Sequence, residues 1–191
     1  MANQCIDQKQ ESLEPEQEPS DKNELFHWIL TLAIAVIIAL CVNRFVLVNA
    51  EIPSGSMENT IMTGDRVFGN RLAYIFGEPK RFDIIIFRYP DDEKQLFIKR
   101  IIGLPGETVE IHDGQIFIDG SKTPLKDVTT KEFMQGSFGP YTVPDNCYFV
   151  MGDNRNNSKD SRYWEHTFVT DDEIVGKAFL RYWPLNKIKF L

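Results

Sequence analysis

Residues 82–102 read FDIIIFRYPDDEKQLFIKRII. Two runs in this stretch, Phe82–Tyr89 and Gln95–Ile102, are rich in isoleucine and aromatic residues, which favour β-strands. Pro90, Asp91 and Asp92 between them have the composition of a turn. The stretch therefore predicts two β-strands joined by a short turn.

The rest of the chain from Ala50 onward has the same β character. Short apolar runs alternate with Gly, Pro, Asp and Asn, and none has a sustained period of 3.6 residues. Residues 109–111 and 116–118 flank Asp113-Gly114, a dipeptide typical of tight hairpins. Further strands are predicted at Cys147–Met151 and Ile174–Tyr182. We expect about seven to nine strands in a mostly β domain over residues 50–191, an antiparallel β-sandwich or barrel.

Residues 25–48 precede this domain and follow a different pattern. Leu25–Val42 (LFHWILTLAIAVIIALCV) contains no Asp, Glu, Lys or Arg, and FVLV extends it after Asn43 and Arg44. About 20 helical residues match the hydrocarbon core of a bilayer, so we predict one transmembrane helix over 25–48 with the lipid bilayer as partner. A cleaved signal peptide is the alternative, but its flank is normally basic.

The flank in this chain is acidic. Residues 1–24 contain seven carboxylates against two lysines and have no aromatic residue. Such a segment buries too little apolar area to offset the entropy of ordering it, so we expect a disordered acidic tail over 1–24.

Composition narrows the class of protein. Of the 191 residues, 42% are hydrophobic, which is typical of a globular protein. The net charge is −7 and no basic stripe is present, so we expect no nucleic-acid partner. The three cysteines form no C-x-x-C motif and the three histidines are scattered. We therefore expect no metal site and no cofactor.

Three polar segments are candidates for chemistry: Ile52–Met57 (IPSGSM), Ile98–Glu107 (IKRIIGLPGE) and Gly152–Arg162 (GDNRNNSKDSR). In the first, Ser54 and Ser56 flank a glycine, which would let backbone N–H groups approach a substrate carbonyl. A serine needs a base before it acts as a nucleophile. An ordinary turn is the alternative interpretation of this segment.

The second segment has two adjacent cations, Lys99 and Arg100, among apolar neighbours. Successive side chains of a strand point to opposite faces, so one of the two faces the side that holds the alternate hydrophobic residues. Burial would lower the pKa of a lysine and make its neutral amine available as a general base. Two solvated charges on a strand edge are the alternative.

The third segment combines Asp153 and Asp160 with Arg155 and Arg162. These pairs predict a hydrogen-bonded polar loop, which is a common surface feature. The spacing of a calcium-binding loop is absent from it.

The order of the motifs is more specific than any one of them. IPSGSM after an apolar segment, then RFDIIIFRYP, KRIIGLPGE and GDNRNNSKDSR, closely resemble the successive signature segments of the bacterial type I signal peptidases. The resemblance extends from Ala50 to about Arg181. It implies a membrane-bound serine endopeptidase that removes signal peptides from exported preproteins after small-x-small sites. It also implies a single-pass protein of the bacterial cell membrane, with a cytoplasmic N-terminus and the catalytic domain outside.

The resemblance implies a catalytic pair. Ser56 matches the nucleophile and Lys99 its general base, a Ser-Lys dyad. Ser54 matches the serine whose hydroxyl forms the oxyanion hole with the Ser56 backbone N–H.

Other matching positions support this pair. Ser158 matches a serine that hydrogen-bonds the lysine amine, and Asp160 matches a carboxylate that supports the site, with Arg162 as its expected ion-pair partner. Gly152 matches the small residue that keeps the approach to the lysine open. For the substrate pocket we expect Ile52, Met57 and Ile98, with the substrate pairing as an added strand beside residues 96–102.

The chain departs from the family pattern at three positions. Asn59 stands where proline is common, Phe82 where glycine is usual and Asn156 where aspartate is frequent. None belongs to the proposed acid–base pair, although Asn59 alters the turn that carries Ser56.

Other functions compatible with the sequence are a Ser-Lys autoprotease, usually a soluble protein, and a membrane-anchored β module that binds peptides without cutting them. A Ser-His-Asp triad is a further alternative. It would need His166, because His27 lies in the predicted helix and His112 beside a hairpin turn.

Overall fold

The computed structural model describes residues 21–75, 77–127 and 133–191, and the chain divides into two units, Met1–Leu40 and Cys41–Leu191. The helix α1 (Asp21–Cys41) accounts for the described part of the first unit. The helical segment Glu24–Val46 is long and apolar enough to cross a membrane. Residues 1–20 of the predicted tail lie outside the described residues.

The helix boundaries differ from the predicted 25–48. Asp21–Glu24, which were assigned to the tail, form the first turn of α1. After Cys41 a π-helical segment, η1 (Val42–Val46), leads into strand β1 (Leu47–Glu51). The end of the apolar run therefore belongs to the β domain, where Val48 is 4% exposed and its strand pairs with the next one. β-Branched residues fit such a half-buried strand well.

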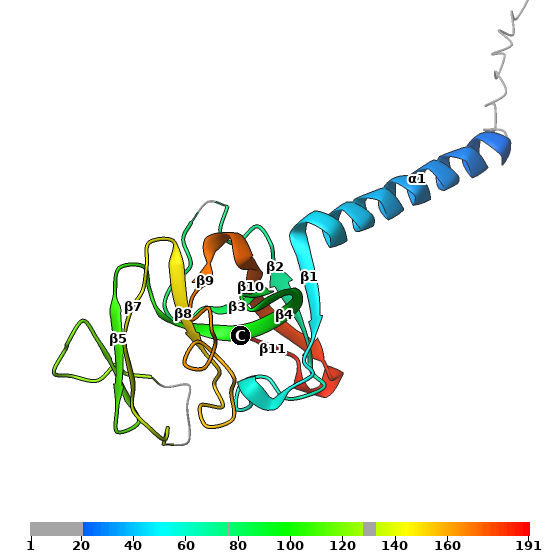
Figure 1. The fold of residues 1–191 in the computed structure, drawn as a ribbon. Coiled ribbons are helices and arrows are strands. Elements are labelled where there is room, and N and C mark those ends of the chain that lie inside the picture. The colour runs from blue at the N-terminus through cyan, green and yellow to red at the C-terminus, as the bar shows by residue number, and fades with distance from the viewer. Residues whose placement is uncertain (1–20, 76, 128–132) are drawn as a thin grey trace, which may run out of the picture. The chain divides into compact units, whose positions relative to one another are not determined.

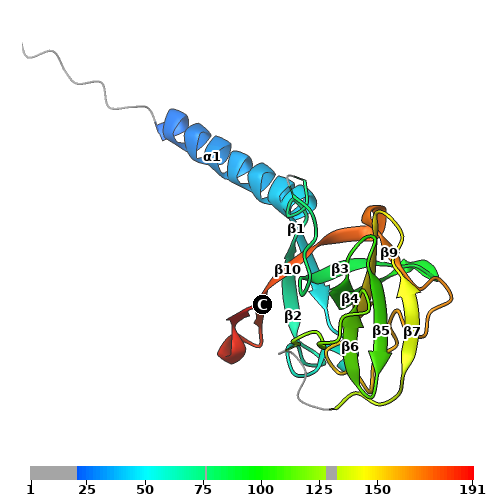
Figure 2. The same cartoon turned by 90° about the vertical axis from the view of Figure 1, so that its left-hand side faces the viewer.

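The second unit consists of antiparallel sheets (Figure 1). Eight strands form the large sheet in the order β1-β2-β10-β3-β4-β8-β9, with β11 beside β10, and three form a small sheet in the order β6-β5-β7 (Figure 2). Their bounds are β2 (Arg66–Asn70), β3 (Ile84–Tyr89), β4 (Asp92–Gly103), β5 (Thr108–His112), β6 (Gln115–Ile118), β7 (Phe138–Thr142), β8 (Cys147–Met151), β9 (Val169–Thr170), β10 (Ile174–Trp183) and β11 (Lys189–Phe190). The predicted fold class, a mostly antiparallel β domain preceded by one apolar helix, is confirmed.

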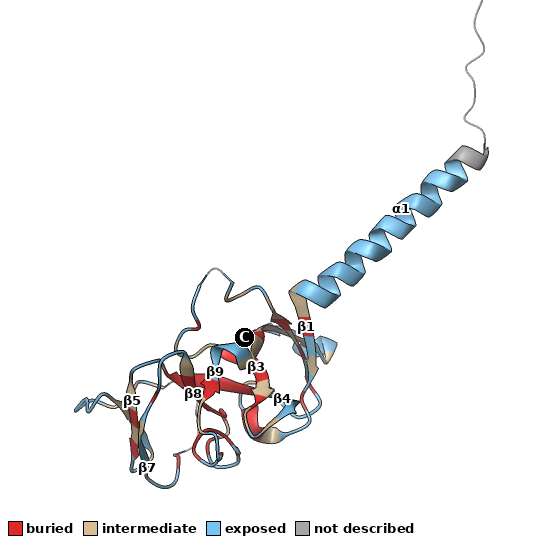
Figure 3. Ribbon diagram, turned by 45° about the horizontal axis from the view of Figure 1, so that its top comes forward, coloured by how far each residue is buried: buried red, intermediate tan, exposed pale blue. Residues whose placement is uncertain are grey.

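The predicted strand pair of residues 82–102 forms β3 and β4. The two strands pair in antiparallel register, with Ile86 opposite Ile98 and Ile85 opposite Lys99. β3 is buried on both faces, because Ile86 packs in one apolar cluster and Ile85 in another (Figure 3). This double burial explains why the strand is an unbroken apolar run without polar alternation.

The Asp113-Gly114 hairpin also forms as predicted, between β5 and β6. Both residues have positive φ angles, 48° and 76°, which a two-residue hairpin turn requires. The described ranges contain more strands than the seven to nine expected. The excess includes β9 and β11, each of two residues and too short to leave a pattern in the sequence.

Candidate active site

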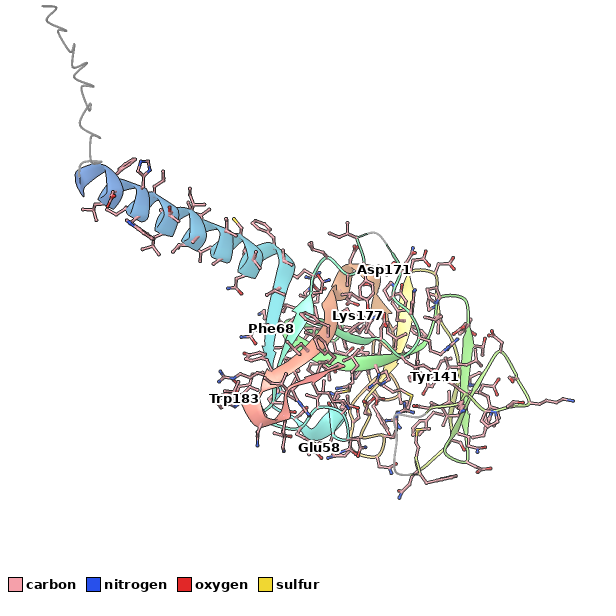
Figure 4. All side chains as sticks on the ribbon, turned by 180° about the vertical axis from the view of Figure 1, so that it is seen from behind. Glu58, Phe68, Tyr141, Asp171, Lys177 and Trp183 are labelled. Carbon is pink, nitrogen blue, oxygen red and sulfur yellow. The ribbon has the colours of Figure 1, made fainter. Side chains whose placement is uncertain are left out.

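Ser56 lies in a tight turn directly after β1. The turn is a 3₁₀ segment, η2 (Gly55–Met57), and Glu58, labelled in Figure 4, follows it. Met57 is fully buried and anchors the turn to the domain core. Ser56 itself is 7% exposed. The turn therefore holds the Ser56 hydroxyl inside the protein and next to a cavity.

Lys99 reaches this hydroxyl from β4. Its Nζ donates to Ser56 Oγ at 2.7 Å and to the carbonyl oxygen of Ile98 at 3.2 Å. Lys99 is 3% exposed, and its Nζ lies 5.3 Å from the centre of the Phe97 ring. Desolvation lowers the pKa of Lys99 to about 8, against the opposing influence of the Asp160 and Asp153 carboxylates. A neutral amine is therefore accessible near neutral pH.

Ser54, the predicted oxyanion-hole residue, lies beside this pair. Its Oγ is 3.4 Å from Ser56 Oγ, and the residue is exposed at the rim of the cavity. A hydroxyl in this position can reach an oxygen of a substrate that is bound next to Ser56.

The polar loop 152–162 braces the turn that carries Ser56. The backbone N–H of Asn154 donates to the Ser56 carbonyl oxygen at 3.1 Å, and its side-chain amide donates to the Gly55 carbonyl oxygen at 3.0 Å. Gly152 is in close contact with the same turn, because a Cβ at Gly152 would lie 2.3 Å from the Ser56 carbonyl oxygen. The position is therefore restricted to glycine by the turn itself, in addition to the predicted need for an open approach to the lysine.

Asp160 and Arg162 form the expected ion pair inside this loop. Arg162 Nε donates to Asp160 Oδ1 and Nη2 to Oδ2, both at 2.8 Å. Asp160 also accepts the backbone N–H of Gly152 at 3.0 Å, and neither charged side chain is exposed. The pair therefore fixes the loop from inside, and its carboxylate acts on Lys99.

Ser158 differs from its predicted role. It is 8% exposed, but its Oγ has no hydrogen-bond partner among the described residues, and the Lys99 amine donates to Ser56 and Ile98 instead. The expected bond from Ser158 to the lysine is absent from this geometry. Ser158 Oγ is nevertheless close to the site, 2.3 Å from where a Cβ on Gly152 would stand.

The other two charged residues of the loop, Asp153 and Arg155, have partners that were not predicted. Asp153 pairs with Arg100 of β4, which donates to its two carboxylate oxygens at 2.7 and 2.6 Å. Arg155 pairs with Asp127 instead. Sequence reasoning missed the Arg100 partner, although two adjacent cations in an apolar strand were a signal for it. Both Lys99 and Arg100 are buried, and a buried guanidinium requires a carboxylate.

Ser56 and Lys99 open onto a cavity of about 380 Å³ between β1 and β4. Two predicted pocket residues, Ile52 and Ile98, line it. Met57 does not, because its side chain is fully buried and packs into the core. The remaining lining residues are Asn49, Ala50, Glu51, Pro53, Ser54, Ile86, Gln95, Leu96 and Phe97.

The three departures from the family pattern have local explanations. Asn59 has a positive φ angle of 91°, which proline cannot adopt. Phe82 also has a positive φ angle, 71°, in the left-handed region that favours glycine, the residue that is usual at this position. Asn156 accepts the backbone N–H of Gln135 at 2.9 Å and donates to the carbonyl oxygen of Phe133 at 3.0 Å. An aspartate could not make the second of these bonds, because an ionised carboxylate only accepts.

His166, the histidine that a Ser-His-Asp triad would need, is bonded to the tip of the β3–β4 hairpin instead of to Ser56. His166 Nδ1 lies 3.0 Å from Asp91 Oδ1, and its side chain is 69% exposed. In the parts of the chain that the structure describes, no group of three His, Cys, Asp or Glu side chains could hold a metal ion. The Ser56 hydroxyl is thus paired with an amine, an arrangement that can activate it as a nucleophile.

Comparison with known proteins identifies the family. The model of the family described as signal peptidase, peptidase S26, matches residues 25–183. Signal peptidase I of Leptolyngbya laminosa is 38% identical over 178 residues, which cover 90% of this chain and 86% of that protein. Signal peptidase I S of Bacillus subtilis is 37% identical over 179 residues, which cover 89% and 95%. The chain therefore belongs to the signal peptidase family, peptidase S26.

A solved structure from the same family also matches. It is the crystal structure of a signal peptidase I from Enterococcus faecalis, with a TM-score of 0.45 and 37% sequence identity. The match covers 52% of this chain and 96% of that one.

Proposed function

We propose that this protein is a membrane-anchored serine endopeptidase that removes signal peptides from exported preproteins, with Ser56 as nucleophile and Lys99 as general base. The observation that carries the proposal is the buried 2.7 Å contact between Lys99 Nζ and Ser56 Oγ at the edge of a cavity. Family membership supports the same activity.

The proposed reaction begins with proton transfer within this pair. The neutral Lys99 amine takes the proton of Ser56 Oγ while this oxygen attacks the scissile carbonyl. The resulting oxyanion is stabilised by the Ser54 hydroxyl and the Ser56 backbone N–H. The lysine ammonium then gives its proton to the leaving amine, and an acyl-enzyme remains. A water that is deprotonated by Lys99 releases the acyl group and restores the serine.

The two sheet edges beside the cavity support binding of the substrate as an added strand. β1 pairs with β2 along one edge, and residues 96–99 of β4 pair with β3, whereas β8 joins β4 only from Arg100 onward. Within the described residues, the opposite edges of β1 and of this part of β4 are therefore unpaired. An extended peptide between them would bond to both.

In such a strand, alternate substrate side chains point into the cavity. Ile52, Ile86 and Ile98 surround that space with apolar branched side chains. A cavity of about 380 Å³ shared by two side chains and part of the peptide backbone favours small residues at the first and third positions before the cut. This geometry supports the proposed small-x-small specificity.

We further propose that the helical segment Glu24–Val46 anchors the protein in the bacterial cell membrane, with the N-terminus cytoplasmic and the catalytic domain outside. The resemblance to type I signal peptidases supports this orientation. Charge does not decide it, because Lys22 on one side of the apolar run is balanced by Arg44 on the other.

Cleavage of a synthetic peptide by the full chain in detergent tests the proposed function. The peptide carries Ala-x-Ala before the scissile bond, and mass spectrometry identifies the cut. We expect one cut, directly after the second alanine. A matched peptide with Leu at both alanine positions should resist cleavage. Absence of any cut in the first peptide, or equal cleavage of both, would contradict the proposal.

The pKa of Lys99 predicts the pH dependence of the reaction. Its neutral form is the active one, so the rate should rise as the pH increases through about 8. At pH 7 about a tenth of the amine is neutral, and a plateau near pH 9 should lie about tenfold higher. Measurement of kcat/KM from pH 6 to 10 checks this. A rate that falls over this range would exclude a neutral lysine base.

Gly152→Ala is expected to lower kcat about tenfold or more, because the added Cβ must displace the Ser56 carbonyl group. Gly77→Ala is the matched control, because a Cβ at Gly77 meets no atom within 4 Å. Circular dichroism verifies the folding of both variants. A normal kcat for Gly152→Ala would show that the turn tolerates the shift.

A further inference from the structure

The tip of the β3–β4 hairpin is bonded to the segment that follows the polar loop. Asp91 Oδ1 accepts the backbone N–H of His166 at 2.8 Å, and Oδ2 accepts the Tyr89 hydroxyl at 2.7 Å and the backbone N–H of Glu165 at 3.2 Å. Burial raises the pKa of Asp91, but the hydrogen bonds from His166, Tyr89 and Glu165 outweigh burial and hold this pKa well below its usual range. Asp91 is therefore an ionised acceptor at every pH of interest.

Trp164 stands next to this tether and packs against aromatic residues of the hairpin. Its ring centre lies 5.3 Å from that of Tyr89, 5.9 Å from Phe87 and 6.1 Å from Phe97. Trp164 is 5% exposed, and its indole N–H has no acceptor among the described residues. A buried donor without an acceptor is destabilising, so aromatic packing rather than a hydrogen bond keeps this side chain in place.

Phe97 connects this cluster to the active site. One neighbour of its ring is Tyr89, stacked at 4.3 Å with the two planes nearly parallel, and another is the Lys99 amine at 5.3 Å. The other groups that face the amine are the Ser56 hydroxyl of η2 and the Asp153 and Asp160 carboxylates of the polar loop. Phe97 therefore supplies an apolar wall that excludes water from the amine.

We propose that Asp91 is a positioning residue that, together with Trp164, holds Phe97 against the Lys99 amine. Asp91 touches none of the reacting atoms. It fixes the segment 164–166 to the hairpin tip, and this segment carries the indole that packs on Phe97. The inference rests on the proposed function, because it assigns a purpose to the environment of the proposed base.

Loss of the Asp91 tether should shift the pH profile of the reaction rather than lower the activity equally at every pH. Asp91→Asn puts an amide, which also donates, opposite two backbone N–H groups and the Tyr89 hydroxyl. The tether loosens, Phe97 withdraws and water reaches the lysine, which favours its charged form. Lys159 and His166 also lie near the hairpin tip; Lys159 lies over the Tyr89 ring, and His166, whose Nδ1 is 3.0 Å from Asp91 Oδ1, loses a charged neighbour in this variant.

The experiment uses the full chain in detergent and compares wild type, Asp91→Asn, Trp164→Leu and Asp92→Asn from pH 6 to 10. Asp92 is the matched control, because it bonds to Lys94 and Gln95 within its own strand and not to the loop. For Asp91→Asn and Trp164→Leu we expect an apparent pKa raised by about one unit. This shift corresponds to kcat about tenfold lower at pH 7, with recovery at pH 10. Asp92→Asn should match the wild type.

A second measurement reads the lysine without turnover. Competitive acetylation of Lys99 as a function of pH, quantified by mass spectrometry, gives its pKa in each variant. If Asp91→Asn lowers activity equally at every pH, or leaves the Lys99 titration unchanged, the positioning role is wrong. A wild type that cuts no peptide would contradict the proposed function instead, and the acetylation result would still decide the role of Asp91.

Discussion

Ser56→Ala and Lys99→Ala should each reduce peptide cleavage by about 10⁴-fold or more, and the double variant should be no slower than either single one. The Ser56 hydroxyl is a weak nucleophile until its proton leaves, and the later proton transfers of Lys99, bonded to this hydroxyl at 2.7 Å, follow only after Ser56 has attacked the substrate. Each residue is therefore ineffective without the other, and their effects should not add.

Lys99→Arg separates the role of the base from the role of the charge. Arginine keeps a cation in the pocket but cannot be deprotonated in a protein, so activity should stay as low as in Lys99→Ala. Ser54→Ala should fall between these variants and the wild type, with a loss of about 10²–10³-fold, because the Ser56 backbone N–H still stabilises the oxyanion. Lys99→Arg with substantial activity would mean that the lysine acts as a charge and not as a base.

The same variants distinguish the alternative functions. A peptide-binding module would bind the Ala-x-Ala peptide equally well in wild type, Ser56→Ala and Lys99→Ala, and would release no product from any of them. An autoprotease would cut its own chain and leave the peptide intact. Fluorescence anisotropy of a labelled peptide, together with electrophoresis of the enzyme itself, measures both. A peptidase is supported if the wild type cleaves the peptide and the Ser56→Ala and Lys99→Ala variants still bind it without cleaving it.

The central strands could be predicted from the sequence because their burial leaves a clear pattern. β8 was predicted with its observed bounds, and β3 and β4 within a few residues. The strands have apolar residues on both faces, or end at a turn with a recognisable composition. β1 was missed because its first residues continue the apolar run of the helix, and composition alone cannot separate a lipid-facing helix from a buried strand.

The residues of the site could be predicted where the chemistry requires one residue type. They could be predicted less well where local geometry decides which way a side chain points and which residue it contacts. Ser56 and Lys99 are brought together as the motif order suggested. Met57 was misplaced because successive residues of a 3₁₀ turn point about a third of a rotation apart, so the neighbour of a cavity-facing serine faces the core. The partner of Asp153 was misassigned because Arg100 is 53 residues away in sequence and approaches only through the sheet.

Loss of the buried ion pair between Asp153 and Arg100 is expected to have the largest effect on stability. Asp153 and Arg100 are 1% and 8% exposed, and Thr60 also donates to the carboxylate. Asp153→Ala leaves the guanidinium buried with bonds to two neutral acceptors, the carbonyl oxygen of Phe82 at 2.7 Å and the Thr60 hydroxyl at 3.5 Å. An uncompensated buried charge costs about 3–5 kcal/mol, which for a chain of this length lowers the thermal midpoint by about 10 °C.

Two comparisons make this prediction specific to the buried charge. Glu51→Gln breaks the exposed pair with Arg66, whose side chains are 66% and 50% exposed, and should cost less than about 1 kcal/mol. The double variant Asp153→Leu with Arg100→Met removes both charges, so most of the lost stability should return. Circular dichroism at one fixed heating rate compares the midpoints of the detergent-solubilised chains. If the double variant is as unstable as Asp153→Ala, the pair contributes through its specific hydrogen bonds to Thr60 and Phe82 rather than through mutual neutralisation.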